Sequence, residues 1–123
     1  MYYSALNFRD IMIASGRIST DGYPAMIQLA NSCIGIEYSG IDEQGQRIMG
    51  LCENQGISNS LLIDEKALRW KVPETMTLEE AATIPVCYYT AYYALIIRGK
   101  LKSREKILIH AGSGGVGQAA ISI

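Results

Sequence analysis

The sequence predicts an α/β protein in which a β-rich unit is followed by an α/β unit. Two observations predict it. Residues 34–72 hold short apolar segments separated by turn residues, which is typical of several short strands in a small barrel-like unit. After Pro73 the composition changes to helix-start signals and then to an apolar run, Ile107–Ile109, that enters a glycine-rich turn. We therefore expect two units, residues 1–74 and 75–123.

The N-terminal segment is expected to form a strand and then a helix. Tyr2–Leu6 is predicted as the strand. Asn7 is a favourable N-cap, and Asp10 lies in the first turn, where an acidic side chain suits the helix dipole. Apolar residues then recur on one helical face until Gly16, which can end the helix.

The rest of the β-rich unit is predicted from alternation and turn residues. The segment 34–39 alternates apolar and polar side chains and is expected to be a half-buried strand. The remaining expected elements are a loop at Thr20–Asn31, a hairpin connection at Asp42–Gln46, a returning strand at Ile48–Cys52, a turn at Glu53–Gly56, and strands at Ile57–Ile63 and Leu68–Val72.

Two helices are expected to open the second unit. Thr77 and Glu80 have the spacing of a capping box, which predicts a short helix after Thr77. Pro85 is tolerated at the start of a second helix, which should extend to Arg98 and end at Gly99.

The glycine-rich turn, Gly112-Ser113-Gly114-Gly115-Val116-Gly117, has the spacing G-x-G-x-x-G. It follows a strand that should be buried on both faces, and a helix should begin by Gln118. In a dinucleotide-binding turn, Gly112 would allow the sharp turn, Gly114 would admit a pyrophosphate to the backbone, and Gly117 would let the helix pack closely. The alternative is a glycine-rich turn that only packs.

Composition and charge exclude several classes of partner. The net charge is −1, so no electrostatic argument favours nucleic acid or an anionic membrane. No apolar run approaches the length of a membrane span, and the first residues do not have the pattern of a signal peptide. Three widely spaced cysteines favour reduced thiols in the cytoplasm over a disulfide framework.

Several stretches carry a resemblance to a known family. They are Leu6–Met12, Gly35–Gly40, Arg47–Gly50, Leu78–Pro85, Tyr89–Leu95 and Ile109–Ala120. In these stretches the chain resembles the enoyl reductase domain of animal fatty acid synthase, within the zinc-independent medium-chain dehydrogenase/reductase superfamily. The resemblance implies a GroES-like β-barrel followed by a Rossmann domain. The N-terminal unit is expected to be incomplete and the Rossmann domain truncated, since the residue that would bind the ribose is expected beyond Ile123.

The resemblance also implies an activity. It is the NADPH-dependent reduction of a trans-2-enoyl thioester on an acyl carrier, within a multifunctional and homodimeric fatty acid synthase whose other domains are its partners. A polyketide synthase enoyl reductase and a quinone or alkenal oxidoreductase of the same superfamily are alternatives. An NADPH-binding structural protein or an inactive fragment is an alternative of another class.

By the resemblance, the cofactor-binding residues are Gly112, Ser113, Gly114, Gly115, Val116, Gly117, Thr90, Asn7 and Asp10. Asn7 and Asp10 can equally be helix-capping residues, and Thr90 can be a helix residue without a function. The stripe of Tyr88, Tyr89, Tyr92 and Tyr93 is expected to pack in the core or a domain interface rather than donate a proton. His110 is expected to be a satisfied core residue.

No metal site is expected. Related zinc enzymes place ligands where Asn7 and Ile36 stand, and neither side chain is a usual zinc ligand. The catalytic residue stays unassigned. Ile18 stands where related reductases carry a tyrosine, Tyr23 is the nearest tyrosine after it, and the proton donor is expected beyond Ile123.

Overall fold

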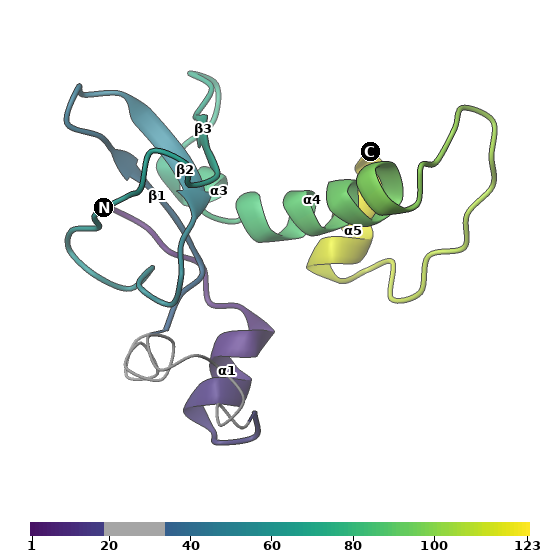
Figure 1. Ribbon diagram of the computed structural model, residues 1–123, viewed down its shortest axis with the longest axis horizontal. Coiled ribbons are helices and arrows are strands. Elements are labelled where there is room, and N and C mark those ends of the chain that lie inside the picture. The colour runs from purple at the N-terminus through teal and green to yellow at the C-terminus, as the bar shows by residue number, and fades with distance from the viewer. Residues whose placement is uncertain (19–33) are drawn as a thin grey trace. The chain divides into compact units, whose positions relative to one another are not determined.

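The computed structural model describes residues 1–18 and 34–123, which form two compact units, Met1–Thr83 and Ile84–Ile123 (Figure 1). The predicted loop at Thr20–Asn31, with Tyr23, and the cysteine Cys33 lie outside the described residues. The structural division falls after Thr83 rather than between residues 74 and 75. The reason is that the short helix predicted after Thr77 contacts the sheet of the first unit. The functional domain assignment stays a prediction.

The first unit is built on a three-stranded antiparallel sheet. Its strands are β1 (Glu37–Ile41), β2 (Arg47–Leu51) and β3 (Arg69–Lys71), in the order β1-β2-β3. The predicted hairpin connection is confirmed: the Asp42 carboxylate accepts from the backbone N–H groups of Gln44 and Gln46 and so closes the turn between β1 and β2.

The first helix, α1 (Phe8–Ala14), forms where the capping residues predict it. Asn7 is the N-cap, and its backbone N–H donates to Asp10 Oδ2 at 2.8 Å. Gly16 follows the helix in the left-handed region, with φ of 68°, and its N–H donates to Ile13 O. The predicted start, first-turn acid and glycine end of this helix are confirmed.

The expectation that β1 is half-buried is wrong, because Glu37 and Ser39 are buried as well as the apolar Tyr38. Two segments cover this strand. Ser4 Oγ donates to Glu37 O at 2.7 Å, and Ser39 Oγ donates at 2.5 Å to Leu78 O. Alternation in the sequence marked these polar residues as solvent-facing, but hydrogen bonds to neighbouring segments allow polar side chains to be buried.

Two predicted strands do not form. Tyr2–Leu6 contributes only one isolated bridge, between Tyr3 and Ser39. Ile57–Ile63 has no strand structure, and Ser58 Oγ lies 2.9 Å from the carbonyl oxygens of both Gln55 and Ser60, either of which can accept its hydrogen bond. Such local side-chain bonds offer the backbone an alternative to pairing in a sheet. The predicted strand at Leu68–Val72 is confirmed over its centre, as β3.

The predicted capping box is confirmed at α3 (Leu78–Ala81). The backbone N–H of Thr77 donates to Glu80 Oε2 at 2.8 Å, and the backbone N–H of Glu80 donates to Thr77 Oγ1 at 3.2 Å. The helix contacts β1 and β2 and covers part of the sheet, so this short element belongs to the first unit.

The second unit holds α4 (Pro85–Tyr92), the π-helix η2 (Tyr93–Arg98) and α5 (Gly115–Ser122). The predicted helix from Pro85 to Arg98 is thus confirmed in extent, although its second half has π-helical bonding. Its end at Gly99 is also confirmed, and a Cβ at this position would lie 2.8 Å from Ala94 O.

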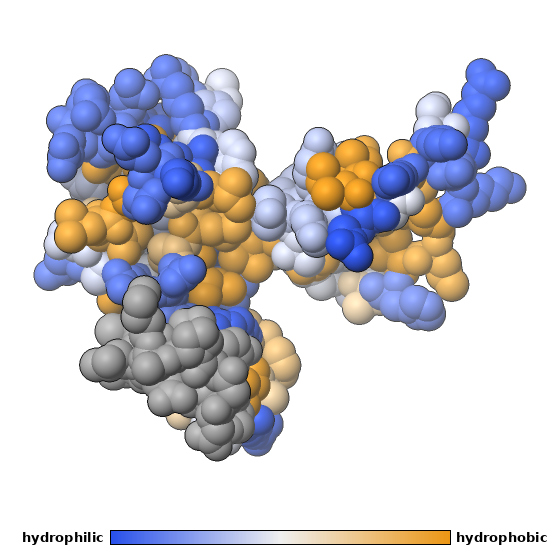
Figure 2. All heavy atoms as spheres, viewed as in Figure 1, coloured by the Kyte–Doolittle hydropathy of each residue, from blue (hydrophilic) through white to orange (hydrophobic). Residues whose placement is uncertain are grey.

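The prediction of a buried strand at Ile107–Ile109 is wrong. No described segment pairs with it, and Leu108 is 83% exposed. A strand needs a hydrogen-bonded neighbour, and all three described strands pair within the first unit. His110 is exposed as well, so the core role expected for it is wrong. Figure 2 shows apolar surface exposed on both units.

Candidate functional site

The glycine-rich turn leads directly into α5. Gly114 is the N-cap, with extended backbone angles of φ −77° and ψ 164°. Its N–H donates to Ala111 O at 3.0 Å, and its carbonyl accepts from the N–H of Gln118 at 2.8 Å. Gln118 Nε2 also donates to Ser113 O at 2.7 Å, which ties the turn to the helix. The helix begins at Gly115, earlier than the expected Gln118.

The glycines of this turn have different physical roles. A Cβ on Gly117 would overlap Ala111 O and lie 2.7 Å from Gly112 Cα, so only glycine lets the helix approach the turn this closely. A Cβ on Gly114 would meet only Ala111 O within 4 Å, at 3.4 Å. The space beside Gly114 is therefore open, while the space beside Gly117 is filled by the protein.

The sharp turn expected at Gly112 is made by its neighbour. Ala111 has a φ of 53°, in the left-handed region, whereas Gly112 and Gly114 have no positive φ. Gly115 is limited by packing, because a Cβ there would lie 2.8 Å from Cys87 Sγ on α4. Backbone conformation therefore does not require glycine at Gly114, and steric access beside it is the remaining physical reason for a glycine.

The turn fits a phosphate-bearing ligand. The first-turn N–H groups of α5 have no carbonyl one turn earlier in the helix to accept from them, and they carry the positive end of the helix dipole. Ser113, Gly114, Gly115 and Val116 are all exposed, so these groups are accessible. A dinucleotide pyrophosphate is the ligand class that such a turn accepts most readily.

Thr90 and the tyrosine stripe lie in the same unit as the turn. Thr90 is exposed on α4. The four tyrosines are 36–48% exposed, and the Tyr89 and Tyr93 rings stack with their centroids 6.0 Å apart. The expectation that these tyrosines pack in a core is therefore wrong within this unit. Their expected packing in a domain interface stays a prediction.

Asn7 and Asp10 belong to the first unit, where they contact the start of β1. Asp10 is fully buried, and its two oxygens accept from the backbone N–H groups of Asn7 and Gly35, at 2.8 and 3.0 Å. Asn7 Nδ2 donates to Glu37 Oε1 at 2.7 Å. The helix-capping role is thus confirmed for Asp10, and the same contacts join the N-terminus of α1 to β1.

Sequence reasoning did not identify Glu37, which is 1% exposed. Its alternation with apolar neighbours indicated a solvent-facing side chain. One sequence feature could have indicated that Glu37 is buried. Its carboxylate stands inside Gly35–Gly40, a stretch that carries the family resemblance. A buried carboxylate needs hydrogen-bond donors, and Asn7 supplies one of them.

Two further contacts surround this cluster. Arg9 Nη1 donates at 2.6 Å to Oδ1 of the buried Asn54. Cys52 Sγ donates to Gly35 O at 3.6 Å. Burial raises the pKa of the Cys52 thiol to about 11, with a smaller contribution from the nearby acidic groups, so the thiol is neutral at physiological pH.

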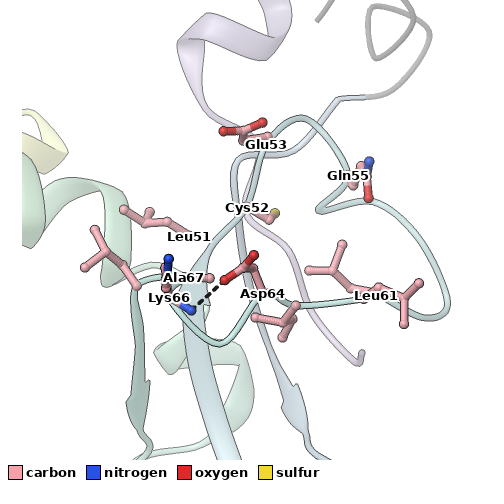
Figure 3. Close-up of a pocket in the computed structure, with 11 residues that line it drawn as sticks. Leu51, Cys52, Glu53, Gln55, Leu61, Asp64, Lys66 and Ala67 are labelled. Carbon is pink, nitrogen blue, oxygen red and sulfur yellow. Dashed lines mark hydrogen bonds between the residues drawn. The ribbon is translucent and has the colours of Figure 1, made fainter. Parts of the chain in front are cut away.

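The first unit also holds a cavity of about 560 Å³, and Cys52 is one of the residues that line it (Figure 3). Figure 3 shows aliphatic side chains such as Leu51 and Leu61 beside the charged Glu53 and Asp64, and the backbone N–H of Lys66 donates to Asp64 Oδ1 at 2.7 Å. None of the predicted site residues lines it.

Within residues 1–18 and 34–123, no group of three or more His, Cys, Asp and Glu side chains is arranged to hold a metal ion. Over the same residues, no helix is both long and apolar enough to cross a bilayer.

The predicted site residues thus fall into two sets. Asn7 and Asp10 lie together in the first unit, and the glycine turn and Thr90 lie in the second. Their assignment to a cofactor stays a prediction.

Comparisons with known proteins identify relatives over nearly the whole chain, although no protein-family model matches it. The chain is 38% identical over 128 residues to squalestatin tetraketide synthase clz2 of Cochliobolus lunatus, which covers 94% of this chain and 4% of that protein. Other curated relatives of similar identity are reducing or highly reducing polyketide synthases, and the chain spans 4% to 6% of the length of those it matches.

Among solved structures, the chain is similar to CurK enoyl reductase, with a TM-score of 0.82 and 32% identity over 96% of this chain and 39% of that one. The quinone oxidoreductase from Coxiella burnetii matches with a TM-score of 0.68 and 25% identity, over 96% of this chain and 40% of that one. These likenesses confirm the predicted fold class, a GroES-like unit followed by the start of a Rossmann domain. They favour the polyketide synthase alternative over the fatty acid synthase expected from the sequence.

Proposed function

We propose that this chain, which is homologous to enoyl reductase domains of the medium-chain dehydrogenase/reductase superfamily, is part of the enoyl reductase of a reducing polyketide synthase. The proposed substrate is an α,β-unsaturated thioester on an acyl carrier, and the proposed cofactor is NADPH. Other domains of the synthase, in a homodimer, are the proposed partners, and the cytoplasm is the proposed location.

The observation that carries the proposal is the contrast between two glycines of the turn. Gly117 is required by close packing of the protein itself, while the space beside Gly114 is open at the N-terminus of α5. A turn that only packs has no need of an open glycine at this position. A pyrophosphate at backbone distance from Gly114 accounts for the open space there.

The residues of the chain would divide the binding between them. The N–H groups of Gly115 and Val116 at the start of α5 would hold the pyrophosphate. On the family resemblance, Asn7, Asp10 and Thr90 are proposed as further cofactor-binding residues. NADPH supplies the hydride, which goes to the β-carbon of the substrate, and a proton goes to the α-carbon. The residues of this chain contribute by binding and orientation, and we assign no proton donor among the described residues.

The experiment uses the full-length protein that contains this chain. We expect it to oxidise NADPH with a crotonyl thioester and to prefer this substrate to a quinone. Preference for a quinone would favour the quinone oxidoreductase alternative, which the similarity to the Coxiella burnetii enzyme supports. NADPH binding without turnover of either substrate would favour a structural, non-catalytic role. Equal rates with NADH would overturn the cofactor assignment.

A further inference from the structure

The lysine, arginine and acidic side chains of the second unit are all gathered in one short basic segment, residues 98–106. Its five cationic residues are Arg98, Lys100, Lys102, Arg104 and Lys106. The segment has one acidic residue, Glu105, and therefore a net charge of +4, whereas the whole chain carries −1. The residues outside the basic segment together carry −5, so the two kinds of charge are strongly separated along the chain.

The cations of the basic segment are accessible. All five side chains are exposed, and Figure 2 shows hydrophilic surface over the loop that leads to α5. Over residues 1–18 and 34–123, the structure shows an ion pair between Arg47 and Glu74 and none in the basic segment. The carboxylate of Glu105 accepts instead from the backbone N–H of Lys102, at 2.8 Å. The cationic groups can therefore meet a partner directly.

The backbone gives the basic segment a turned shape. The N–H of Leu101 donates to a carbonyl of η2 at 2.9 Å, which ties down the start of the segment. The N–H of Glu105 donates to Lys102 O at 3.1 Å and closes a turn. Lys100 and Arg104 are in the left-handed region, with φ of 51° and 72°. Because these contacts order the segment, binding through it costs less conformational entropy.

Charge and chain organisation favour a protein as the partner. A local charge of +4 attracts an acidic surface and speeds its association. Nucleic acid or an anionic membrane has continuous negative charge, which also meets the rest of the chain, with its net −5. The acidic face of a folded domain is small, and at physiological salt charges beyond about 8 Å are largely screened.

Such domains are available in the relatives of this chain. The matched region makes up 4% to 6% of the reducing polyketide synthases, so many other domains belong to the same polypeptide. Tethering raises the effective concentration of one domain around another. A docking surface made of a few exposed charges is then sufficient.

We propose that the basic segment docks against an acidic face of another domain of the same synthase. This inference rests on the proposed function, because that function places the chain in a multidomain synthase, and it adds an interdomain surface. The lysines would contact Asp and Glu side chains of that face as point charges, while the arginines can bind carboxylates through two hydrogen bonds.

The test uses the full-length protein and a carbodiimide, which joins a lysine amine to a carboxylate in direct contact, without a spacer. Mass spectrometry identifies the joined residues. We expect Lys100, Lys102 or Lys106 to be joined to Asp or Glu residues of another domain. The yield should fall at least about fivefold when the ionic strength is raised from about 0.1 M to about 1 M, because the Debye length falls from about 10 Å to about 3 Å.

Two arginine variants provide a matched comparison. Arg98→Gln/Arg104→Gln removes two charges of the basic segment but keeps the three lysines that report the contact, and we expect the yield to fall at least about threefold. Arg17→Gln/Arg69→Gln removes two exposed arginines of the first unit and should leave the yield unchanged. Thermal unfolding of both variants checks the fold, and the salt dependence tests the contact without any substitution.

The outcomes are distinct. Cross-links only within residues 1–123, no cross-links from the three lysines, or equal yields in both variants would overturn the docking surface. Binding of the full-length protein to duplex DNA or to phosphatidylserine vesicles that Arg98→Gln/Arg104→Gln abolishes would also overturn it, in favour of a polyanion. The cross-linking needs neither NADPH nor a thioester, so failure to reduce the crotonyl thioester would count against the proposed activity alone.

Discussion

At the residue scale, Tyr38 shows that burial in this protein is not always matched by hydrogen bonding. Its ring is 1% exposed, and its hydroxyl is the one buried side-chain oxygen or nitrogen of the described residues that has no hydrogen-bond partner. Burial raises the pKa of Tyr38 to about 12, so the hydroxyl stays neutral. Its position also restricts Gly50, where a Cβ would lie 2.6 Å from the hydroxyl oxygen.

Tyr38→Phe should therefore leave the stability of the full-length protein unchanged or raise it, by up to about 1–2 kcal/mol, because a buried hydroxyl without a partner costs free energy. Thermal or urea unfolding measures the effect. Tyr3→Phe is the matched control, since the exposed Tyr3 hydroxyl has a partner in Glu79 and its removal should bring no gain. A clear loss of stability in Tyr38→Phe would indicate a hydrogen bond that the structure lacks.

The two glycines of the turn predict opposite phenotypes. The backbone φ of Gly114 is one that alanine adopts, and the new Cβ would meet only Ala111 O, at 3.4 Å. The Gly114→Ala protein should therefore fold normally. NADPH should bind at least about tenfold more weakly, because the Cβ occupies the space that the pyrophosphate needs. Gly117→Ala should instead destabilise the protein, because its Cβ would overlap Ala111 O.

Fluorescence titration with NADPH and thermal unfolding, run on both variants, check this pair. Normal NADPH binding and turnover in Gly114→Ala would mean that the turn only packs. Normal stability in Gly117→Ala would mean that α5 can move away from the turn without cost.

At the scale of elements, α3 depends on its cap. Its four residues make too short a helix to be stable without end contacts, and both halves of its capping box are present. The helix also presents Leu78 O to Ser39 Oγ, so its loss would remove the acceptor of a buried hydroxyl in β1.

Thr77→Ala should lower the free energy of unfolding by about 1 kcal/mol, because the N–H of Glu80 loses its acceptor. Thr77→Ser should restore most of it. Thr75→Ala is the control, an exposed threonine in the preceding turn, and it should change little. Urea unfolding of the three variants gives the comparison, and equal stability of Thr77→Ala and Thr75→Ala would contradict the capping role.

At the scale of the whole molecule, much apolar surface stays uncovered. Leu62 and Leu108 are 98% and 83% exposed, and among the described residues β3 pairs with β2 and no segment pairs with its other edge. Exposed apolar side chains and free strand edges favour association.

We therefore expect residues 1–123, expressed alone, to associate at micromolar concentration, as measured by sedimentation velocity. The double variant Leu62→Ser/Leu108→Ser should reduce association, while Lys66→Ser/Lys102→Ser, which changes exposed polar residues, should not. A monomer with one cooperative thermal transition would contradict the expectation.

Local signals in the sequence were sufficient for the features that depend on residues close in the chain. The N-cap at Asn7, the capping box at Thr77, the hairpin at Asp42 and the helix start at Pro85 all involve hydrogen bonds or steric limits within a few residues. The spacing of the glycine turn predicted the close approach at Gly117 in the same way, since the atoms that exclude a Cβ there belong to Ala111 and Gly112. The stretches of family resemblance predicted the fold class.

Tertiary structure decided whatever depends on distant partners. The Ile107–Ile109 run is apolar enough for a buried strand, but strand formation needs a neighbour that no described segment provides. Glu37 appeared solvent-facing by alternation, yet Asn7, thirty positions away, supplies a hydrogen bond that compensates part of the cost of its burial. Sequence patterns record the preferences of a side chain, whereas burial and pairing depend on which distant groups the fold brings within hydrogen-bond reach.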